Sequence, residues 1–353
     1  MEVDISLPTG QQRARTRWGT HESGAAFDRK KRPYLSEQAQ TFMTQQAFCV
    51  LAGRGPHGEL DGQLAMEKPG FVEIVDEQSC LLHLTTSLRT SLLFQRLEQA
   101  SLAEEASPAA LFFICHPTRE RLCVHGTAQL LPERKAPIFW PFKRQNSLCM
   151  RFNVEESFFH CSKYVRTRIA GLTAPALPCE DQQWRPQQLL NTDQHSLSEE
   201  VRAFLSKQVL CFLCTVNQEG RCAVNHRGGA AGFLLAFPPD RVSSGGMVLL
   251  PDYAGNGAFE ALGNILETGQ ATLVVPHYAA QMAVSITGVA GIFEQAEFPA
   301  WLARKYQGAE RAIAIAVQRV SVQHGDWSAT LACERARAES LGKVTNPILA
   351  CPV

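Results

Sequence analysis

The sequence lacks the features that mark membrane, nucleic-acid-binding and exported proteins. No apolar run approaches the roughly 18 residues that a membrane-spanning helix needs. Net charge is also absent, because 34 lysines and arginines balance 34 aspartates and glutamates, so no overall field favours nucleic acid or an anionic membrane. Residues Met1–Asp4 carry neither the basic segment nor the apolar core of a signal peptide. These absences predict a cytoplasmic protein without a nucleic-acid or membrane partner.

Disulfide and metal-site patterns are missing as well, although the chain has 12 cysteines. Most of them lie within apolar segments, as Cys49 and Cys123 do, where a reduced thiol behaves as a small hydrophobic side chain. Disulfide frameworks belong to short secreted chains. Cys211 and Cys214 form a CxxC pair, but no second pair lies at zinc-site spacing. We therefore predict reduced core cysteines and no metal site.

What the chain does have is the composition of a globular protein. Its 353 residues are 45% hydrophobic and 19% charged, which is enough for two domains of ordinary size. Residues 1–33 are polar and basic, and we expect a flexible segment there, with a nucleic-acid-binding arm as the alternative. Residues 170–196 contain three prolines and no periodic apolar pattern, which predicts a linker.

The chain repeats itself at an interval of 162 residues. A stripe of four apolar positions, typical of a short amphipathic helix, occurs twice. The stripes are Leu35, Ala39, Phe42 and Met43, then Leu197, Val201, Phe204 and Leu205; further pairs at this interval are Cys49 and Cys211, Gly58 and Gly220, Gly70-Phe71 and Gly232-Phe233, and Gly126 and Gly288. These matches predict a tandem duplication of one domain, with copies at residues 34–169 and 197–330 and a C-terminal tail over 331–353.

Each copy reads as a short helix, hairpin strands, a second helix and further hairpin strands. In the second copy, Ser196 and Glu199 have the spacing of a capping box before the first helix. This order predicts a mainly β protein, in which each copy folds as an antiparallel sheet closed into a small β-barrel with accessory helices. The strict strand–helix alternation of a doubly wound parallel sheet is absent.

Chemistry-bearing residues gather at a hairpin of the second copy. The apolar run Val209–Val216 and the turn after it predict a strand and a hairpin, whose second strand ends in His226, Arg227, Gly228 and Gly229. An imidazole and a guanidinium before a glycine bend favour anions, phosphates in particular. The alternative is an ordinary strand exit with a solvated arginine. A second strand end, Asp252 to Asn256, bends through glycine into a helix start, where free N–H groups again converge.

These segments resemble the FMN-binding split-barrel proteins of the pyridoxamine 5′-phosphate oxidase-like superfamily. The resemblance rests on NHRGGAAGF, PDYAGNGAFEALGNIL and Ser285–Gly288 in the second copy, and on FFHCSKYVRTR in the first. It implies Greek-key split barrels of about six strands each, packed as an intrachain pseudo-dimer with FMN in the groove between them. The residues matching the family's cofactor site are His226, Arg227, Gly228, Gly229, Asp252, Tyr253, Gly255 and Asn256.

The two copies depart from the family in different ways. Where the family's bend reads Gly-Asn-Arg, this chain has Gly257, and Leu64–Glu67 replace the His-Arg-Gly-Gly strand end in the first copy. The first copy instead offers hydroxyl groups and cations, namely Thr85, Ser87, Arg89, His160 and Lys163. We therefore predict one composite site, in which Thr85, Ser87 and Arg89 hold the phosphate and share a groove with the His226 strand. Replacing Arg89 with alanine is expected to weaken flavin binding.

The function predicted from the resemblance is that of an FMN-dependent oxidoreductase with an unknown small-molecule substrate. No Ser-His-Asp or Cys-His nucleophile order stands out, and Cys161 next to His160 is not expected to act as a nucleophile. Two alternatives remain: a protein that binds FMN or haem without turnover, and a degenerate split-barrel scaffold. The pseudo-dimer is expected to be monomeric or to dimerise further.

Overall fold

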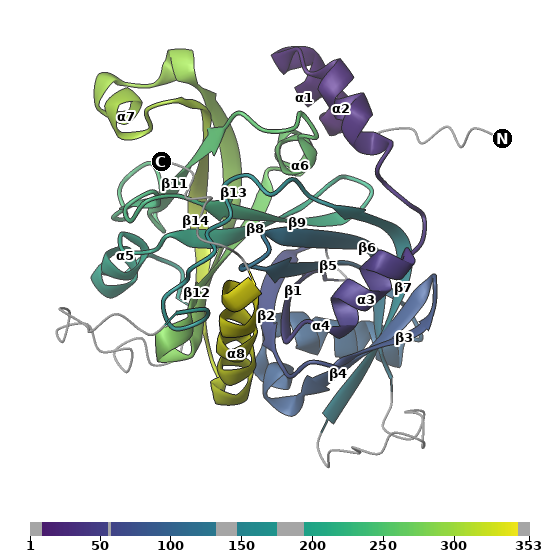
Figure 1. Ribbon diagram of the computed structural model, residues 1–353. Helices are drawn as coiled ribbons and strands as arrows, with labels where there is room; N and C mark the ends of the chain where they lie inside the picture. The colour runs from purple at the N-terminus through teal and green to yellow at the C-terminus, as the bar shows by residue number, and fades with distance from the viewer. Residues whose placement is uncertain (1–8, 56–57, 132–146, 175–193, 345–353) are drawn as a thin grey trace.

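The structure is a computed structural model and describes residues 9–55, 58–131, 147–174 and 194–344. Most of the predicted linker and the end of the predicted tail lie outside these residues. Two seven-stranded antiparallel sheets form the body of the protein, with helices around them (Figure 1). The prediction of a mainly β protein made of two barrels is confirmed, with seven strands in each sheet rather than about six.

The first sheet contains the strands of the first copy in the order β2-β1-β5-β6-β7-β4-β3. Its strands are β1 (Phe48–Arg54), β2 (Leu60–Met66), β3 (Val72–Asp76), β4 (Ser79–Thr85), β5 (Ser107–Cys115), β6 (Glu120–Leu131) and β7 (Ser147–Phe159). The helices of this half are α3 (Glu37–Thr44), η1 (Thr86–Thr90) and α4 (Leu92–Leu102).

The second sheet repeats the first, strand for strand, in the order β9-β8-β12-β13-β14-β11-β10. Its strands are β8 (Leu210–Val216), β9 (Cys222–Gly228), β10 (Leu235–Phe237), β11 (Met247–Tyr253), β12 (Gln270–His277), β13 (Met282–Glu294) and β14 (Ala309–His324). Its helices are α5 (Glu199–Leu205), α6 (Glu260–Thr268), η3 (Tyr278–Ala280), η4 (Gln295–Glu297) and α7 (Ala300–Lys305). Register repeats too, because Phe48 pairs with Met66 and Leu210 pairs with Gly228. The chain is a tandem duplication.

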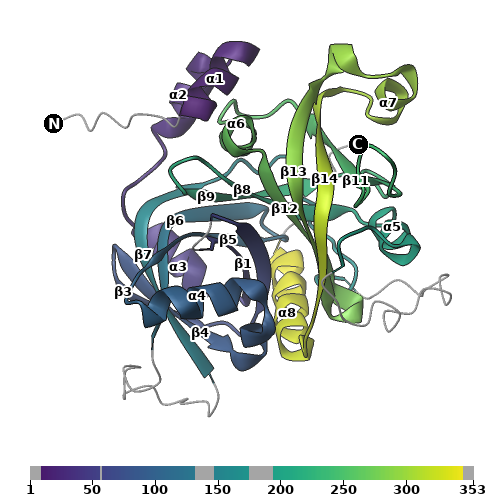
Figure 2. The same ribbon diagram turned by 180° about the vertical axis from the view of Figure 1, so that it is seen from behind.

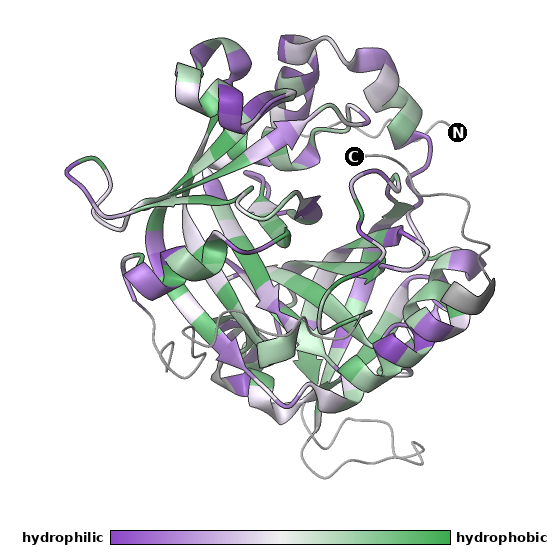
Figure 3. Cartoon of the chain, turned by 60° about the vertical axis from the view of Figure 1, so that its left-hand side comes forward, coloured by the Kyte–Doolittle hydropathy of each residue, from purple (hydrophilic) through white to green (hydrophobic). Residues whose placement is uncertain are grey.

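The two barrels meet in an apolar seam, which buries the outer faces of β1, β2 and β5 against β8, β9 and β12. Side chains alternate along β8, where Cys211 and Leu213 point into their own barrel while Leu210, Phe212 and Cys214 pack in the seam. A strand buried on both faces reads as a continuous apolar run. Figure 3 shows the same pattern as green strands in the middle of the molecule.

Contacts across the seam are reciprocal. Strand β2 contacts β12 and β13, and its counterpart β9 contacts β5 and β6. The phenyl rings of Phe112 and Phe212 lie 5.9 Å apart between centroids at the centre of the seam. Reciprocal contacts of this kind describe an isologous interface about an approximate two-fold axis. The predicted intrachain pseudo-dimer is confirmed.

The N-terminal segment is folded from residue 9 onwards, contrary to the flexible segment expected there. It forms α1 (Thr9–Trp18) and α2 (His21–Asp28), and α1 packs on α6 (Figure 1). Arg15 is 2% exposed, and its Nη1 lies 2.6 Å from Oδ2 of Asp28. This arginine is therefore neutralised inside the protein and not solvated, because burial of a charge without such a partner is costly.

The described part of the predicted C-terminal tail is also folded. It forms α8 (Ser328–Val344), which follows β14 and lies between the two barrels (Figure 2). Trp327 and Leu331 belong to the seam core, and Leu341 packs against the core of the first barrel. Within the described residues, no helix is both long and apolar enough to cross a membrane.

Helix capping repeats in both copies, but not at the position predicted. The Ser198 hydroxyl accepts a hydrogen bond from the amide of Val201, 3.3 Å away, at the start of α5. Ser36 does the same for Ala39 at the start of α3. The capping box expected at Ser196 is therefore wrong by two residues, because Ser198 holds the N-cap position.

A glycine at a β-bulge is a further feature that both copies share. Register shifts between His125 and Gly126 in β6, and between Thr287 and Gly288 in β13. A Cβ atom on Gly288 would collide with the backbone carbonyl of Ala316, and Gly126 meets that of Asn153 in the same way. The bulge brings two backbones so close that no side chain fits.

We expect Gly288→Ala to lower the free energy of unfolding by about 1–3 kcal/mol, the usual cost of forcing atoms into a packed interior. Gly291→Ala is the matched control, because Gly291 lies on the same strand and a Cβ atom there would meet nothing within 4 Å. Urea unfolding of both variants measures the difference. Equal stability of the two variants would contradict the assignment of the bulge.

Candidate functional site

A pocket opens at one end of the seam and takes its walls from both barrels. From the first barrel come Arg121 on β6 and the segment after β7; from the second come the end of β9, the end of β11 and the start of α6. Phe27 of α2 completes the lining. Because β9 ends beside the last residues of the first copy, the two-fold packing itself creates this pocket.

His226 lines the pocket and is 7% exposed. Neither of its ring nitrogens has a hydrogen-bond partner among the described residues. Its ring lies 6.0 Å from that of His116 and 5.9 Å from that of Phe212, between centroids. Burial, and then the neighbouring His116 and Arg121, hold the pKa of His226 well below 6.5. The imidazole is therefore neutral at pH 7, with its polar atoms available to a ligand.

Arg227, the next residue on β9, is held by Asp252. The carboxylate of Asp252 accepts from Arg227 on one oxygen, and from Nε of Arg311 at 2.8 Å on the other. Asp252 is 4% exposed, so two cations compensate its buried charge. Nε of Arg227 has no hydrogen-bond partner among the described residues. The aspartate thus orients Arg227 at the pocket wall.

The first barrel supplies the opposite wall. Arg121 is 9% exposed, and burial lowers its pKa to about 10. Its Nε, like Nε2 of His160, has no hydrogen-bond partner among the described residues. Burial, with Arg121 next in weight, holds the pKa of His160 well below 6.5. This wall therefore presents a desolvated guanidinium next to a neutral imidazole.

The segment after β7 forms hydrogen bonds with the two bends of the second barrel that follow β9 and β11. Arg166 donates from Nη2 to the carbonyl oxygen of Gly229 at 2.8 Å, and the Tyr164 hydroxyl donates to that of Ala254 at 3.2 Å. The rings of Tyr164 and Tyr253 are stacked with centroids 5.8 Å apart. An aromatic pair thus stands at a pocket that is otherwise rich in cations.

Gly257 marks the place where the family's bend has an arginine. Its φ is +71°, and a Cβ atom there would collide with Oγ of Ser23 and crowd Thr20. Helix α2 therefore occupies the space that a side chain at this position would need. The missing cation has a packing reason, since the N-terminal segment lies against the bend.

Comparison with known proteins gives one family match. Residues 197–324 match the family model described as pyridoxamine 5′-phosphate oxidase. The match covers the second copy of the repeated domain, and this copy is similar to the pyridoxamine 5′-phosphate oxidase family. A search of curated proteins gives no match to the chain.

Solved split-barrel structures align with about a third of the chain. They include HupZ of Group A Streptococcus, with 14% identity over 35% of this chain and 91% of that one and a TM-score of 0.27. HutZ, the haem storage protein of Vibrio cholerae, has 15% identity over 37% and 92%, with a TM-score of 0.22. A Clostridium acetobutylicum protein related to general stress protein 26 has 15% identity over 35% and 85%, with a TM-score of 0.25. These values support no inference about a ligand.

Nine of the thirteen residues predicted from the split-barrel resemblance line the pocket. They are His160, Lys163, His226, Arg227, Gly228, Asp252, Tyr253, Gly255 and Asn256. Gly229 lies directly behind β9, in the hydrogen bond with Arg166. The structure thus brings together elements of both copies, as the composite hypothesis requires. That these residues bind a cofactor stays a prediction.

Thr85, Ser87 and Arg89 do not line the pocket, so the predicted sharing of one groove with the His226 strand is wrong. They lie at the end of β4 and in η1, where the Thr85 amide donates to Oε1 of Glu67 at 2.7 Å. Glu67 occupies the position of Gly229 in the other copy. The approximate two-fold axis relates the pocket to an equivalent place on the other side of the seam, here called the counterpart of the pocket. Thr85, Ser87 and Arg89 lie at this counterpart.

Helix α8 covers that counterpart. The Thr330 hydroxyl donates to the carbonyl oxygen of Glu67, and Nε2 of Gln323 donates to that of Leu64 at 2.7 Å. Leu64 and Met66, which replace His226 and Gly228, are buried in the seam core. Among the described residues, therefore, one of the two symmetry-related grooves is an open pocket, and the other is covered by α8 and filled by apolar side chains.

Sequence reasoning missed Arg121, His116 and the role of Tyr164. Arg121 is the second residue of β6 and His116 directly follows β5, and neither position carries a motif. Tyr164 lies within FFHCSKYVRTR, in which the sequence predicts only His160 and Lys163 as site residues. The available signal was that this segment, unlike the linker after it, keeps aromatic and basic residues interleaved.

We expect stability to fall as the pH decreases from 6.5 towards 4. The pKa values of His160 and His226 lie well below 6.5 in the folded protein, and that of His116 is about 4, mainly because of burial. Histidines of the unfolded chain protonate near 6.5. In this range the unfolded state binds more protons, so acid favours unfolding.

The variant His226→Asn is expected to flatten this pH dependence, measured by urea unfolding between about pH 4.5 and about pH 8. The control is the difference in the free energy of unfolding between the variant and the unsubstituted protein at about pH 8. There His226 is neutral in both the folded and the unfolded state, so this difference reports packing alone. An unchanged slope would mean that His226 is not held neutral.

Proposed function

We propose that the pocket binds FMN and that the protein is an FMN-dependent oxidoreductase. The observation that carries the proposal is the set of buried nitrogen atoms around the pocket without a partner among the described residues: Nε of Arg121 and Arg227, Nε2 of His160, and both ring nitrogens of His226. Buried polar groups are ordinarily hydrogen-bonded. A ligand with acceptor oxygens would satisfy such a set.

The charge balance of the pocket favours an anion. Both acidic residues of the lining have cationic partners, since Asp252 pairs with two arginines and Glu260 lies 4.0 Å from Nζ of Lys31. Arg121 and Lys163 have no carboxylate partner among the described residues. A phosphate would compensate this excess of positive charge through charge-assisted hydrogen bonds.

The remaining lining suits a planar ring. Tyr164 and Tyr253 stack at the pocket, and Phe27 and Phe259 add apolar surface. An oxidised flavin would supply hydride or electron transfer, while the residues around it bind and orient it. The superfamily resemblance favours FMN among phosphate-bearing aromatic ligands, and the chemistry at the ring would need no nucleophile from the chain.

The first test is the absorbance of the purified protein and its titration with FMN, followed by flavin fluorescence. We expect one FMN per chain, because the counterpart groove is covered by α8. Bleaching of the bound flavin by NADH or NADPH would support the oxidoreductase, and binding without bleaching would favour a carrier. A colourless protein that ignores FMN would contradict the proposal.

Arg121→Ala should weaken FMN binding by about 1.5–3 kcal/mol, the value of a hydrogen bond to a charged group, which is about 10- to 150-fold in Kd. Arg89→Ala is the matched control, since Arg89 was predicted for the phosphate but does not line the pocket. Equal losses in the two variants would remove Arg121 from the site.

A haem-binding role is the second candidate, and the histidines favour it. His160 and His226 line the pocket as neutral imidazoles with unpartnered nitrogens, which is the form that ligates iron. Haem also carries anionic groups that Arg121 and Lys163 would pair with. Titration with haem should then give a Soret band that is lost in His160→Ala or His226→Ala, while the absorbance and fluorescence of added FMN stay those of free FMN.

A further inference from the structure

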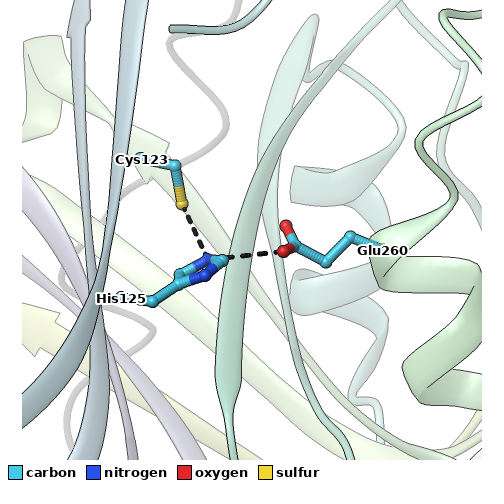
Figure 4. A group of neighbouring side chains, drawn as sticks. All are labelled: Cys123, His125 and Glu260. Atoms are coloured by element: carbon cyan, nitrogen blue, oxygen red, sulfur yellow. Dashed lines mark hydrogen bonds and ion pairs between the residues drawn. The ribbon is translucent and has the colours of Figure 1, made fainter. Parts of the chain in front are cut away.

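A cluster of potential metal ligands lies in the seam beside the pocket (Figure 4). Cys123 and His125 project from β6, and Glu260 begins α6 of the other barrel. Sγ of Cys123 lies 3.2 Å from Nε2 of His125, and Nε2 lies 3.6 Å from Oε1 of Glu260. All three ligand atoms lie within 4.8 Å of one another.

These separations fit the ligand shell of a tetrahedral zinc ion. Zinc lies about 2.3 Å from thiolate sulfur and about 2.0–2.2 Å from imidazole nitrogen or carboxylate oxygen. At tetrahedral angles, such bonds place sulfur about 3.6 Å from nitrogen and nitrogen about 3.4 Å from oxygen. The sulfur–nitrogen separation in the cluster is 3.2 Å and the nitrogen–oxygen separation is 3.6 Å, so both come close to the zinc geometry and small side-chain rotations would complete it.

His125 is oriented as a zinc-ligating histidine usually is. Its Nδ1 lies 3.1 Å from Oε1 of Glu156, the residue opposite it on β7. A carboxylate that accepts from one ring nitrogen directs the lone pair of the other towards the metal. Glu156 is fixed in turn by Lys31, whose Nζ lies 3.1 Å from the same oxygen. Nε2 is thereby left facing Cys123 and Glu260.

We propose that Cys123, His125 and Glu260 bind a divalent transition-metal ion, Zn²⁺ by its ligand preference, at the inner wall of the pocket. A thiolate with an imidazole suits zinc better than magnesium or calcium, which prefer oxygen ligands alone. Three protein ligands leave one tetrahedral position for water or an anion. Glu260 lines the pocket and so connects the ion to it.

The competing explanation for this cluster is a network of balanced charges without a metal ion. In that network, Lys31 and a protonated His125 pair with Glu156 and Glu260. The other copy shows what such a network looks like without metal-ligating residues. There Thr287 stands opposite Arg319, in place of His125 and Glu156, and Arg319 pairs directly with Asp61 at 2.9 Å. Ser285 holds the position of Cys123. The thiol and imidazole are therefore not needed to fill this place in the fold.

A nucleophilic role for Cys123 is disfavoured by its position. The side chain belongs to the seam core and is 0% exposed, so a substrate carbon does not reach the sulfur. An ion needs only a path past Glu260, whose side chain is 12% exposed. The same burial would keep bulk solvent away from the thiolate sulfur.

Cobalt(II) provides the test, because a tetrahedral Co²⁺ site with a thiolate gives visible d–d bands and a sulfur-to-cobalt charge-transfer band. We expect the full-length apoprotein, prepared with a chelator, to bind one Co²⁺ per chain with both signals, and Zn²⁺ to displace it. As purified, the protein should contain about one zinc per chain by mass spectrometry. Neither readout depends on FMN, so this test can fail or succeed apart from the flavin proposal.

Cys123→Ser should abolish the charge-transfer band, and Glu260→Gln should weaken Co²⁺ binding at least 10-fold while retaining that band. Glu156→Gln should weaken binding by about 10- to 100-fold, the usual effect of removing the group that orients a histidine ligand. Cys214→Ser is the matched control, as Cys214 is also buried in the seam. Absence of tight Co²⁺ binding, or identical spectra for Cys123→Ser and Cys214→Ser, would overturn the proposal in favour of the ion network.

Discussion

Burial of β1 and β8 on both faces is the constraint on which the rest of the structure depends. Each strand contributes one set of side chains to its own barrel and the alternate set to the seam, so neither barrel has a water-compatible outer face there. Burying a large apolar side chain contributes about 1.5–3 kcal/mol. Phe112 and Phe212, together with the other side chains of the seam core, would form a larger exposed apolar patch than a stable monomeric barrel tolerates. The halves are therefore one folding unit, although each has its own core.

The two-fold packing generates two equivalent grooves, and the chain treats them differently. On one side β9 ends in a histidine and an arginine beside Arg121, which leaves desolvated polar atoms around a pocket. On the other side β2 ends in Leu64 and Met66, and α8 completes an apolar core over them. In a homodimer the two grooves have the same residues, because both subunits have the same sequence. Duplication within one chain removes that restriction, so one groove can specialise while the other gains stability.

The repeat, the barrels and most of the pocket were accessible from the sequence because they depend on local patterns. Apolar runs, glycine turns and the 162-residue interval are properties of neighbouring residues or of equal spacing. The sequence could not show which residues of the first copy face the His226 strand. Thr85 and Arg121 are both suitable phosphate ligands by side-chain type, and only the packing of the two barrels across the axis decides which of them lies at the pocket. The metal-ligand cluster had the same obstacle, since His125 and Glu260 belong to different barrels.

The ends of the chain were misread for a related reason, as their polar residues find partners far away in sequence. Arg15 is compensated by Asp28, and Lys31 by Glu156 of β7, so charges that look solvated are internal. Charge runs without apolar periodicity predict disorder only when no such partners exist.

Symmetry explains where these ends lie. The segment before the first copy and the segment after the second are each present once, so each can cover only one of the two grooves. Helix α1 packs on α6, α2 lies against the bend at Gly257 beside the pocket, and α8 fills the counterpart of the pocket. Phe27 lines the pocket, and α2 holds the space next to Gly257 that an arginine would need. Because Lys31 also fixes Glu156, the N-terminal segment touches both the pocket and the proposed metal ligands. Any ligand that enters the pocket therefore meets a wall built from three parts of the chain, the two barrels and the segment that precedes them.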